Sequence, residues 1–164
     1  MKLKVNFIRK LARAKTINEI VFVKSKKVKN NNLTPILKWV LENQLFKDLE
    51  IIQREHKNKN YIFINCKKLS LSSDFESIGS KLFDYLEKNK IENSYINFNT
   101  IDISNVQLEK TIHGAKLKSY NFDIYKSNNK KNKNINLNII GKQIAKSNFL
   151  RKKLDALLDG VFFY

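Results

Sequence analysis

The chain has 164 residues, of which 42% are hydrophobic, so it is long enough to bury a core and too apolar to be disordered. Its formal net charge of +17 invites a nucleic-acid interpretation. The lysines are spread through every predicted element, however, and Asn and Ile are abundant together with Lys. That joint bias is typical of an AT-rich coding sequence, so a solvated basic surface is the simpler interpretation.

Cysteine content and hydropathy indicate where the chain resides. Cys66 is the only cysteine, which excludes an internal disulfide and favours a reducing compartment. No apolar run in the sequence approaches the roughly 20 residues of a membrane helix. Residues 1–10 alternate like a strand and lack the apolar core and cleavage site of a signal peptide. We therefore expect a cytoplasmic protein with no membrane contact.

Alternation and short apolar runs predict the first strands. Residues 2–8 alternate between apolar and polar side chains and predict a half-buried strand. Residues 19–23 predict a second strand, residues 25–32 a loop, and residues 49–52 a short strand. Residues 61–66 are apolar on both faces, which is typical of an interior strand covered on both sides by helices.

Residues 33–45 predict the first helix. Thr34 can cap its amino end, and Pro35 suits its first turn. Trp39 is expected in the core. The segment that starts at His56 is rich in Lys and Asn and predicts an exposed turn. His56 has no partner ligand at a useful spacing, so it is not expected to bind a metal.

Two capping boxes predict the next helices. Ser73-x-x-Glu76 precedes apolar residues at helical spacing. Ser104-x-x-Gln107 opens a further helix, which is expected to end near Lys118. Each box pairs a hydroxyl and a longer polar side chain with the free backbone N–H groups at a helix start, so both are specific signals.

Two more strands, at residues 95–99 and 135–140, complete the predicted sheet. The order from residue 61 to residue 99 is strand, helix, strand, which favours a parallel crossover. Gly114 lies inside a predicted helix, where it costs about 1 kcal/mol relative to Ala, so we expect it to allow close approach of a neighbouring backbone. A last helix is predicted from Lys142. The expected fold class is α/β, with a mixed sheet of about five to six strands flanked by helices.

No catalytic motif can be recognised. The four glycines are dispersed: Gly79, Gly114, Gly141 and Gly160. They form no phosphate-binding loop. Neither His56 nor His113 belongs to a zinc motif, and no serine stands in a G-x-S-x-G context. Cys66 at the end of a strand is expected to be a buried small residue, not a nucleophile. The sequence therefore predicts no catalytic or metal-binding residue.

One stretch carries a family resemblance. It reads LEKTIHGAKLKSYNFDIYKS from Leu108 onward, and the carboxyl-terminal segment reads ALLDGVFFY. Both are similar to the amino-terminal domain of the leucyl aminopeptidase (cytosol aminopeptidase) family. The matching residues are Gly114, Ser119, Tyr120, Phe122, Asp123, Tyr125, Lys126 and Ser127. We expect Tyr120, Phe122 and Tyr125 to be packing anchors.

The resemblance implies a domain without catalytic residues. It implies a macro-domain-like α/β domain over residues 1–141 and a linker helix over residues 142–164, leading to an absent carboxyl-terminal catalytic domain. That domain holds two divalent metals (Mn or Zn) in the family, acts on peptides and assembles into homo-hexamers. The large apolar residues at 161–164 look like a cut through a longer protein. No metal ligand or catalytic residue can be carried over to this chain.

Two alternatives stay open at this point. A stand-alone nucleic-acid-binding domain would use the basic loop, with Lys126, Lys130, Lys131 and Lys133 as candidate contacts, and some bacterial members of the family bind DNA. A macro-type domain that binds ADP-ribose is the second alternative. It needs glycine-rich loops near the diphosphate, and the dispersed glycines argue against it.

Overall fold

The computed structural model describes residues 2–8, 17–24, 34–42, 50–124 and 134–141, together with Lys152 and Ala156. Its strands are β1 (Lys2–Ile8), β2 (Ile17–Val23), β3 (Ile51–His56), β4 (Lys59–Asn65), β5 (Asn93–Asn97) and β6 (Asn134–Ile140). Its helices are α1 (Thr34–Glu42), α3 (Ser72–Lys88) and α4 (Asn105–Ile124). The six predicted strands are all found, with ends shifted by a few residues.

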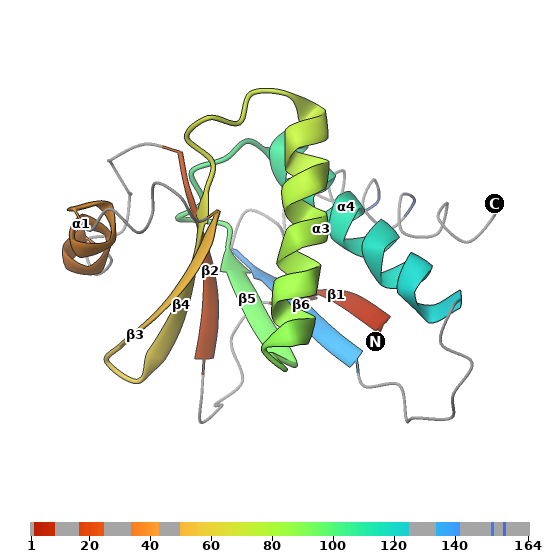
Figure 1. Cartoon of the computed structure of the whole chain (residues 1–164), viewed down its shortest axis with the longest axis horizontal. Coiled ribbons are helices and arrows are strands. Elements are labelled where there is room, and N and C mark those ends of the chain that lie inside the picture. The colour runs from red at the N-terminus through yellow and green to blue at the C-terminus, as the bar shows by residue number, and fades with distance from the viewer. Residues whose placement is uncertain are drawn as a thin grey trace.

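The strands form one six-stranded sheet in the order β1-β6-β5-β2-β4-β3. All neighbours are parallel except β3 and β4, which are antiparallel. Figure 1 shows α3 and α4 beside each other over one face of the sheet, and α1 set apart near β3 and β4. The prediction of an α/β fold with a mixed sheet of five to six strands flanked by helices is confirmed.

Each face of the sheet has its own apolar cluster. Because side chains alternate along a strand, Ile20 and Phe22 of β2 pack with α3 and α4, whereas Val21 and Val23 pack with α1. Residues 61–64 of β4 are buried on both faces. The prediction of an interior strand covered on both sides is confirmed. Helices α3 and α4 therefore cover one face of the sheet, and α1 packs on the opposite face.

The capping box predicted for Ser73 and Glu76 does not form, although the helix that it predicted, α3, is present. Helix α3 begins one residue before Ser73, and the carboxylate of Asp74 accepts the backbone N–H groups of Ser70 at 3.0 Å and Leu71 at 2.9 Å. Asp74 therefore accepts the backbone hydrogen bonds at the helix start that were predicted for Glu76. Because Asp74 bonds the backbone N–H groups of Ser70 and Leu71, the Glu76 side chain is available for contacts with α4.

The second capping box is confirmed in both directions. The N–H of Ser104 donates to Gln107 Oε1 at 3.0 Å, and the N–H of Gln107 donates to Ser104 Oγ at 3.2 Å. The predicted end near Lys118 is wrong, because α4 continues to Ile124. No Gly or Pro interrupts residues 119–124, so nothing in the local sequence stops the helix there.

A tight hairpin joins β3 to β4. The turn consists of Lys57 and Asn58, whose φ angles are 48° and 61°. Two left-handed residues in a two-residue connection are typical of a type I′ turn, which suits the twist of the flanking strands. Sequence analysis placed only a short strand at residues 49–52 and a turn from His56 onward. His56 instead ends β3, so the strand is longer than predicted.

Trp39 is not a core residue, which corrects the prediction. Ile36 and Val40 of α1 are buried against the sheet, whereas 47% of Trp39 is exposed. The guanidinium carbon of Arg54, on β3, lies 5.0 Å from the centre of the Trp39 ring. Such a cation–π contact contributes about 0.5–1 kcal/mol at an exposed site. Trp39 thus helps to attach α1 to β3 from its solvent side.

The position of Trp39 can be tested by fluorescence, because it is the sole tryptophan of the chain. We expect emission typical of a hydrated indole and efficient quenching by iodide, which reaches only exposed rings. Replacing Arg54 with Gln should leave the fold intact and change the emission intensity, since the cation leaves the ring. A blue-shifted emission that iodide does not quench would show that Trp39 is buried after all.

Several predictions fall outside the described residues. These are the loop at 25–32, the end of the first helix at 43–45, and nearly all of the helix predicted from Lys142. Lys152 and Ala156 are the exceptions, and both are helical and exposed. None of the described helices is long and apolar enough to cross a membrane.

Candidate functional site

Helices α3 and α4 touch backbone to backbone at two glycines. A Cβ atom on Gly79 would collide with the carbonyl of Thr111 and the backbone nitrogen of Ala115. A Cβ atom on Gly114 would collide with the carbonyl of Glu76. The close approach predicted for Gly114 is therefore confirmed, and Gly79 makes the reciprocal contact, which was not predicted.

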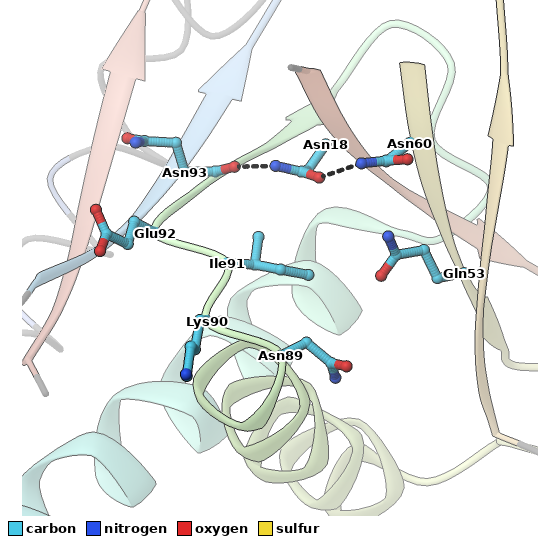
Figure 2. Close-up of a pocket in the computed structure, with 8 residues that line it drawn as sticks. All are labelled: Asn18, Gln53, Asn60, Asn89, Lys90, Ile91, Glu92 and Asn93. Carbon is cyan, nitrogen blue, oxygen red and sulfur yellow. Dashed lines mark hydrogen bonds between the residues drawn. The ribbon is translucent and has the colours of Figure 1, made fainter. Parts of the chain in front are cut away.

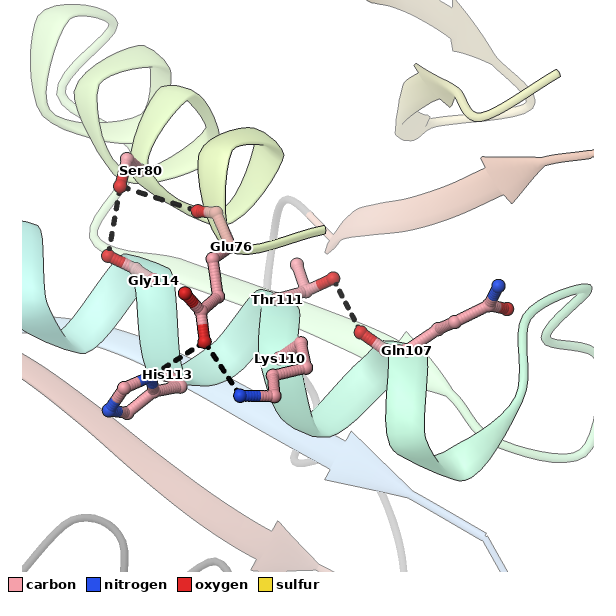
Figure 3. Close-up of polar contacts among 7 residues, drawn as sticks. All are labelled: Glu76, Ser80, Gln107, Lys110, Thr111, His113 and Gly114. Carbon is pink, nitrogen blue, oxygen red and sulfur yellow. Dashed lines mark hydrogen bonds and ion pairs between the residues drawn. The ribbon is translucent and has the colours of Figure 1, made fainter. Parts of the chain in front are cut away.

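A polar cluster joins the two helices beside this contact, as Figure 3 shows. Glu76 Oε1 accepts a hydrogen bond from Lys110 Nζ at 2.8 Å and lies 3.2 Å from His113 Nδ1. Ser80 Oγ donates to the carbonyl of Gly114 at 3.1 Å. The hydrogen bond from Lys110, followed by that from His113, holds the pKa of Glu76 below its usual range.

The lowered pKa of Glu76 disfavours this carboxylate as a general base. A carboxylate that is stabilised in its ionised form is a weak general base. Glu76 and His113 therefore resemble an acid–base pair in composition only. The arrangement is better suited to joining α3 and α4, because the Glu76 carboxylate on α3 contacts both Lys110 and His113 on α4.

Replacing Glu76 with Gln should lower stability at neutral pH by less than about 1 kcal/mol, because the pair is partly exposed and screened. The pKa of Glu76 is depressed in the folded state, so its contribution is present above its unfolded pKa and is lost as pH falls through the folded value. The variant should therefore show a shallower loss of stability in acid. Urea unfolding at pH 7 and pH 3 measures this, and identical acid profiles would contradict it.

The described residues also form a hollow of about 470 Å³, which we call the amide pocket (Figure 2). It is lined by Asn18, Gln53, Asn60, Asn89, Lys90, Ile91, Glu92 and Asn93. Asn60 Nδ2 donates to Asn18 Oδ1 at 3.2 Å, and Asn18 Nδ2 donates to the carbonyl of Asn93 at 2.8 Å. The amide pocket thus spans the amino ends of β4, β2 and β5, next to the end of α3.

The place of the amide pocket in the sheet is unusual. Ligands of open α/β sheets ordinarily bind at the carboxyl ends of the strands. The amide pocket lies at the opposite edge. None of its residues was predicted from the sequence, although a signal existed: Asn18, Asn60 and Asn93 each occupy one of the first two positions of a parallel strand.

A row of polar side chains crosses the face of the sheet that packs with α1. Glu19 is buried, and Tyr95 Oη donates to its carboxylate at 2.5 Å. Tyr61 stands beside Glu19 in register, and Asn138 continues the row beyond Tyr95. Asn6 Nδ2 donates to Asn138 Oδ1 at 3.1 Å. Burial, and then the bond to Glu19, raises the pKa of Tyr95.

Nucleophilic and metal chemistry find little support among the described residues. Cys66 is fully buried, as expected, and burial raises the pKa of its thiol to about 12. A thiol with that pKa carries almost no thiolate at neutral pH. Within the described ranges, no three or more His, Cys, Asp or Glu side chains are grouped so that they could hold a metal ion.

The residues of the family motif are not gathered into a site. Gly114 lies at the helix contact, Ser119 is buried and donates to the carbonyl of Lys116 at 2.8 Å, and Tyr120 is half-buried. The motif positions Phe122 and Asp123 belong to α4, but their side chains are outside the description. Outside the described residues altogether are Tyr125, Lys126, Ser127, Lys130, Lys131 and Lys133.

Comparison with known proteins identifies the fold. No model of a protein family matches the chain, and no curated protein matches it. Among solved structures, a leucine aminopeptidase mutant from tomato matches 95% of this chain with a TM-score of 0.62 and 13% sequence identity. The shared property is the fold. The match covers 35% of the tomato chain, so this chain corresponds in length to about a third of that aminopeptidase.

Proposed function

We propose that this chain is the non-catalytic amino-terminal domain of a metal-dependent leucyl aminopeptidase, an enzyme that removes amino-terminal residues from peptides. The observation that carries the proposal is the shared fold, which extends over 95% of this chain and 35% of the tomato aminopeptidase. The motif around Gly114 and Tyr120 adds independent support, because it resembles the same family in sequence.

The proposal divides the parent enzyme into two parts. Residues 1–141 form the α/β domain, and residues 142–164 lead to a catalytic domain that binds two divalent metals, Mn or Zn. Two such metals would supply the activation of a water molecule for attack on the peptide bond.

The role left for the domain is structural. We propose that it takes part in assembling a homo-hexamer and in limiting access of peptides to the active sites. The rigid contact of α3 with α4 suits that role, because two helices joined at Gly79 and Gly114 present a fixed surface to a neighbouring subunit.

A hydrolysis assay tests the proposal. The purified chain is incubated with a leucine anilide, without metal and with added Mn²⁺ or Zn²⁺. We expect no hydrolysis above the blank in any condition, since the catalytic groups belong to the other domain. Metal-dependent hydrolysis that EDTA abolishes would contradict the assignment.

The coding sequence after Tyr164 provides a second test. An open frame that continues into the N-T-D-A-E-G-R signature of the aminopeptidase family would support the two-domain organisation. Expression of the continuous frame should then produce a hexamer with metal-dependent activity, measured by light scattering and the same assay. A stop codon directly after Tyr164 would overturn the two-domain proposal.

A further inference from the structure

Four amide side chains of the amide pocket are oriented by hydrogen bonds within the protein. Asn60 is bonded to Asn18, and Asn18 to the carbonyl of Asn93. Tyr85 orients two more amides, because its hydroxyl donates to Gln53 Oε1 at 3.2 Å and its carbonyl accepts from Asn89 Nδ2 at 2.8 Å. Four amides from separate parts of the chain are thus oriented, which lowers the entropic cost of binding.

These bonds leave much of the hydrogen-bonding capacity unused. A side-chain amide has two N–H donors and one oxygen acceptor with two lone pairs. Among the described contacts, both N–H groups of Gln53 and one N–H group each of Asn18, Asn60 and Asn89 make no bond. The amide oxygens of Asn60 and Asn89 also accept none of these bonds. Donors and acceptors therefore stand side by side around one hollow.

Charge limits the kind of ligand. Lys90 and Glu92 bring opposite charges to the rim. The carboxyl end of α3, which carries a partial negative charge, lies beside the amide pocket and disfavours anions. The many N–H donors disfavour a cation, which needs oxygen ligands. Ile91, only 9% exposed, offers an apolar contact.

From this geometry we propose that the amide pocket binds a small, neutral, hydroxyl-rich molecule of the monosaccharide or cyclic polyol class. A hydroxyl group both donates and accepts, so it matches an amide that presents N–H and oxygen together. The volume of about 470 Å³ falls in the usual range for small-molecule sites, roughly 300–1,000 Å³. This binding is separate from the proposed peptidase parentage, and neither depends on the other.

Nuclear magnetic resonance of the ¹⁵N-labelled chain tests the proposal with glucose and myo-inositol as probes. We expect saturable shifts in the side-chain amide signals of Gln53 and Asn60, with dissociation constants in the millimolar range, on the order of 1–10 mM. Glucuronate and glucosamine, which carry a charge, should bind at least threefold more weakly. Equal or tighter binding of either charged sugar would overturn the neutral class.

Variants locate the site. Asn60→Ala and Gln53→Ala should each weaken binding about fivefold, the effect of one lost hydrogen bond. Tyr85→Phe should weaken it less, because Gln53 keeps its donors and loses only its orientation. Asn105→Ala removes an exposed amide at the start of α4 and should change nothing. The proposal is overturned if neither probe causes saturable shifts up to roughly 100 mM, or if the Asn60 and Gln53 variants bind as the wild type does.

Discussion

Replacing Gly114 with Ala is expected to lower the free energy of unfolding by about 3 kcal/mol, the range for overpacking against an unyielding neighbour. The added Cβ would meet the backbone carbonyl of Glu76, not a side chain that can turn away. Helix propensity acts in the opposite direction, since Ala in a helix is about 1 kcal/mol better than Gly. The contact with α3 should outweigh propensity, so α3 and α4 would have to move apart.

Thermal and urea unfolding measure this effect. A loss of 3 kcal/mol corresponds to a fall in melting temperature of roughly 6–12 °C for a domain of this size. Val106→Ala, at a position of α4 that is 54% exposed, is the matched control and should change stability by less than about 0.5 kcal/mol. A Gly114→Ala variant as stable as the wild type, or more stable, would show that the helices do not touch there.

Removing the hydroxyl of Tyr95 is expected to cost about 2 kcal/mol at neutral pH, because the buried carboxylate of Glu19 loses the bond that the phenol donates. The cost exceeds that of an ordinary hydrogen bond, since a buried acceptor is left without this donor. Tyr61→Phe is a suitable comparison. Tyr61 is buried beside Glu19 in the same row, and the smaller loss expected there isolates the effect of the Tyr95 bond.

Alkaline pH provides an independent readout of the same residue. The pKa of Tyr95 is raised in the folded state by burial and by Glu19, so above pH 10 the unfolded chain releases a proton that the folded chain keeps. The contribution of Tyr95 to stability is therefore constant below pH 10. It falls as pH rises from 10 toward the folded pKa, by about 1.4 kcal/mol per pH unit for each such proton.

Unfolding in urea at pH 8 and pH 11 measures this alkaline loss. Tyr95→Phe should lose less stability between the two values than the wild type, because one of the protons held by folding is gone. The pKa of Tyr61 and of Tyr85 is also raised by burial, so some alkaline loss should persist in the variant. An unchanged alkaline loss would mean that Tyr95 is not buried beside Glu19.

Local signals predicted the elements where no tertiary contact competed with them. The box of Ser104 and Gln107 is satisfied within its own turn, and it was found as predicted. Glu76 has the same pattern with Ser73 but bonds to Lys110 and His113 of another helix. The partners of Glu76 lie more than 30 positions away in the chain, so no local pattern could have revealed them.

Side-chain placement was harder to predict than the elements themselves. Trp39 has the composition of a core residue, yet it lies beside the buried stripe of α1 and contacts Arg54. The face of α1 that meets the sheet packs in part with Ile52, Tyr61 and Phe63, which the hairpin of β3 and β4 brings together. That hairpin turns at Lys57 and Asn58 without a glycine, so the most familiar turn signal is absent from the sequence.

The candidate site was not predictable because its residues are individually ordinary. Asn18, Asn60 and Gln53 belong to three strands, and Asn is common throughout this chain. The pairing of Asn18 with Asn60 across β2 and β4, and the pairing of β3 with β4, make the three residues neighbours. Because Asn is common throughout the chain, composition alone does not indicate the pocket. The register of the sheet does, since it places Asn18 beside Asn60.

The order of the strands constrains how the chain folds during its synthesis. β1 is made first, yet its neighbour in the sheet is β6, and their paired residues Asn6 and Asn138 are 132 positions apart. At typical elongation rates of about 5–20 residues per second, β6 follows β1 out of the ribosome only after on the order of ten seconds. During that interval Leu3 and its strand have no β6 edge to join, so the apolar face of β1 stays uncovered in the nascent chain and is open to aggregation.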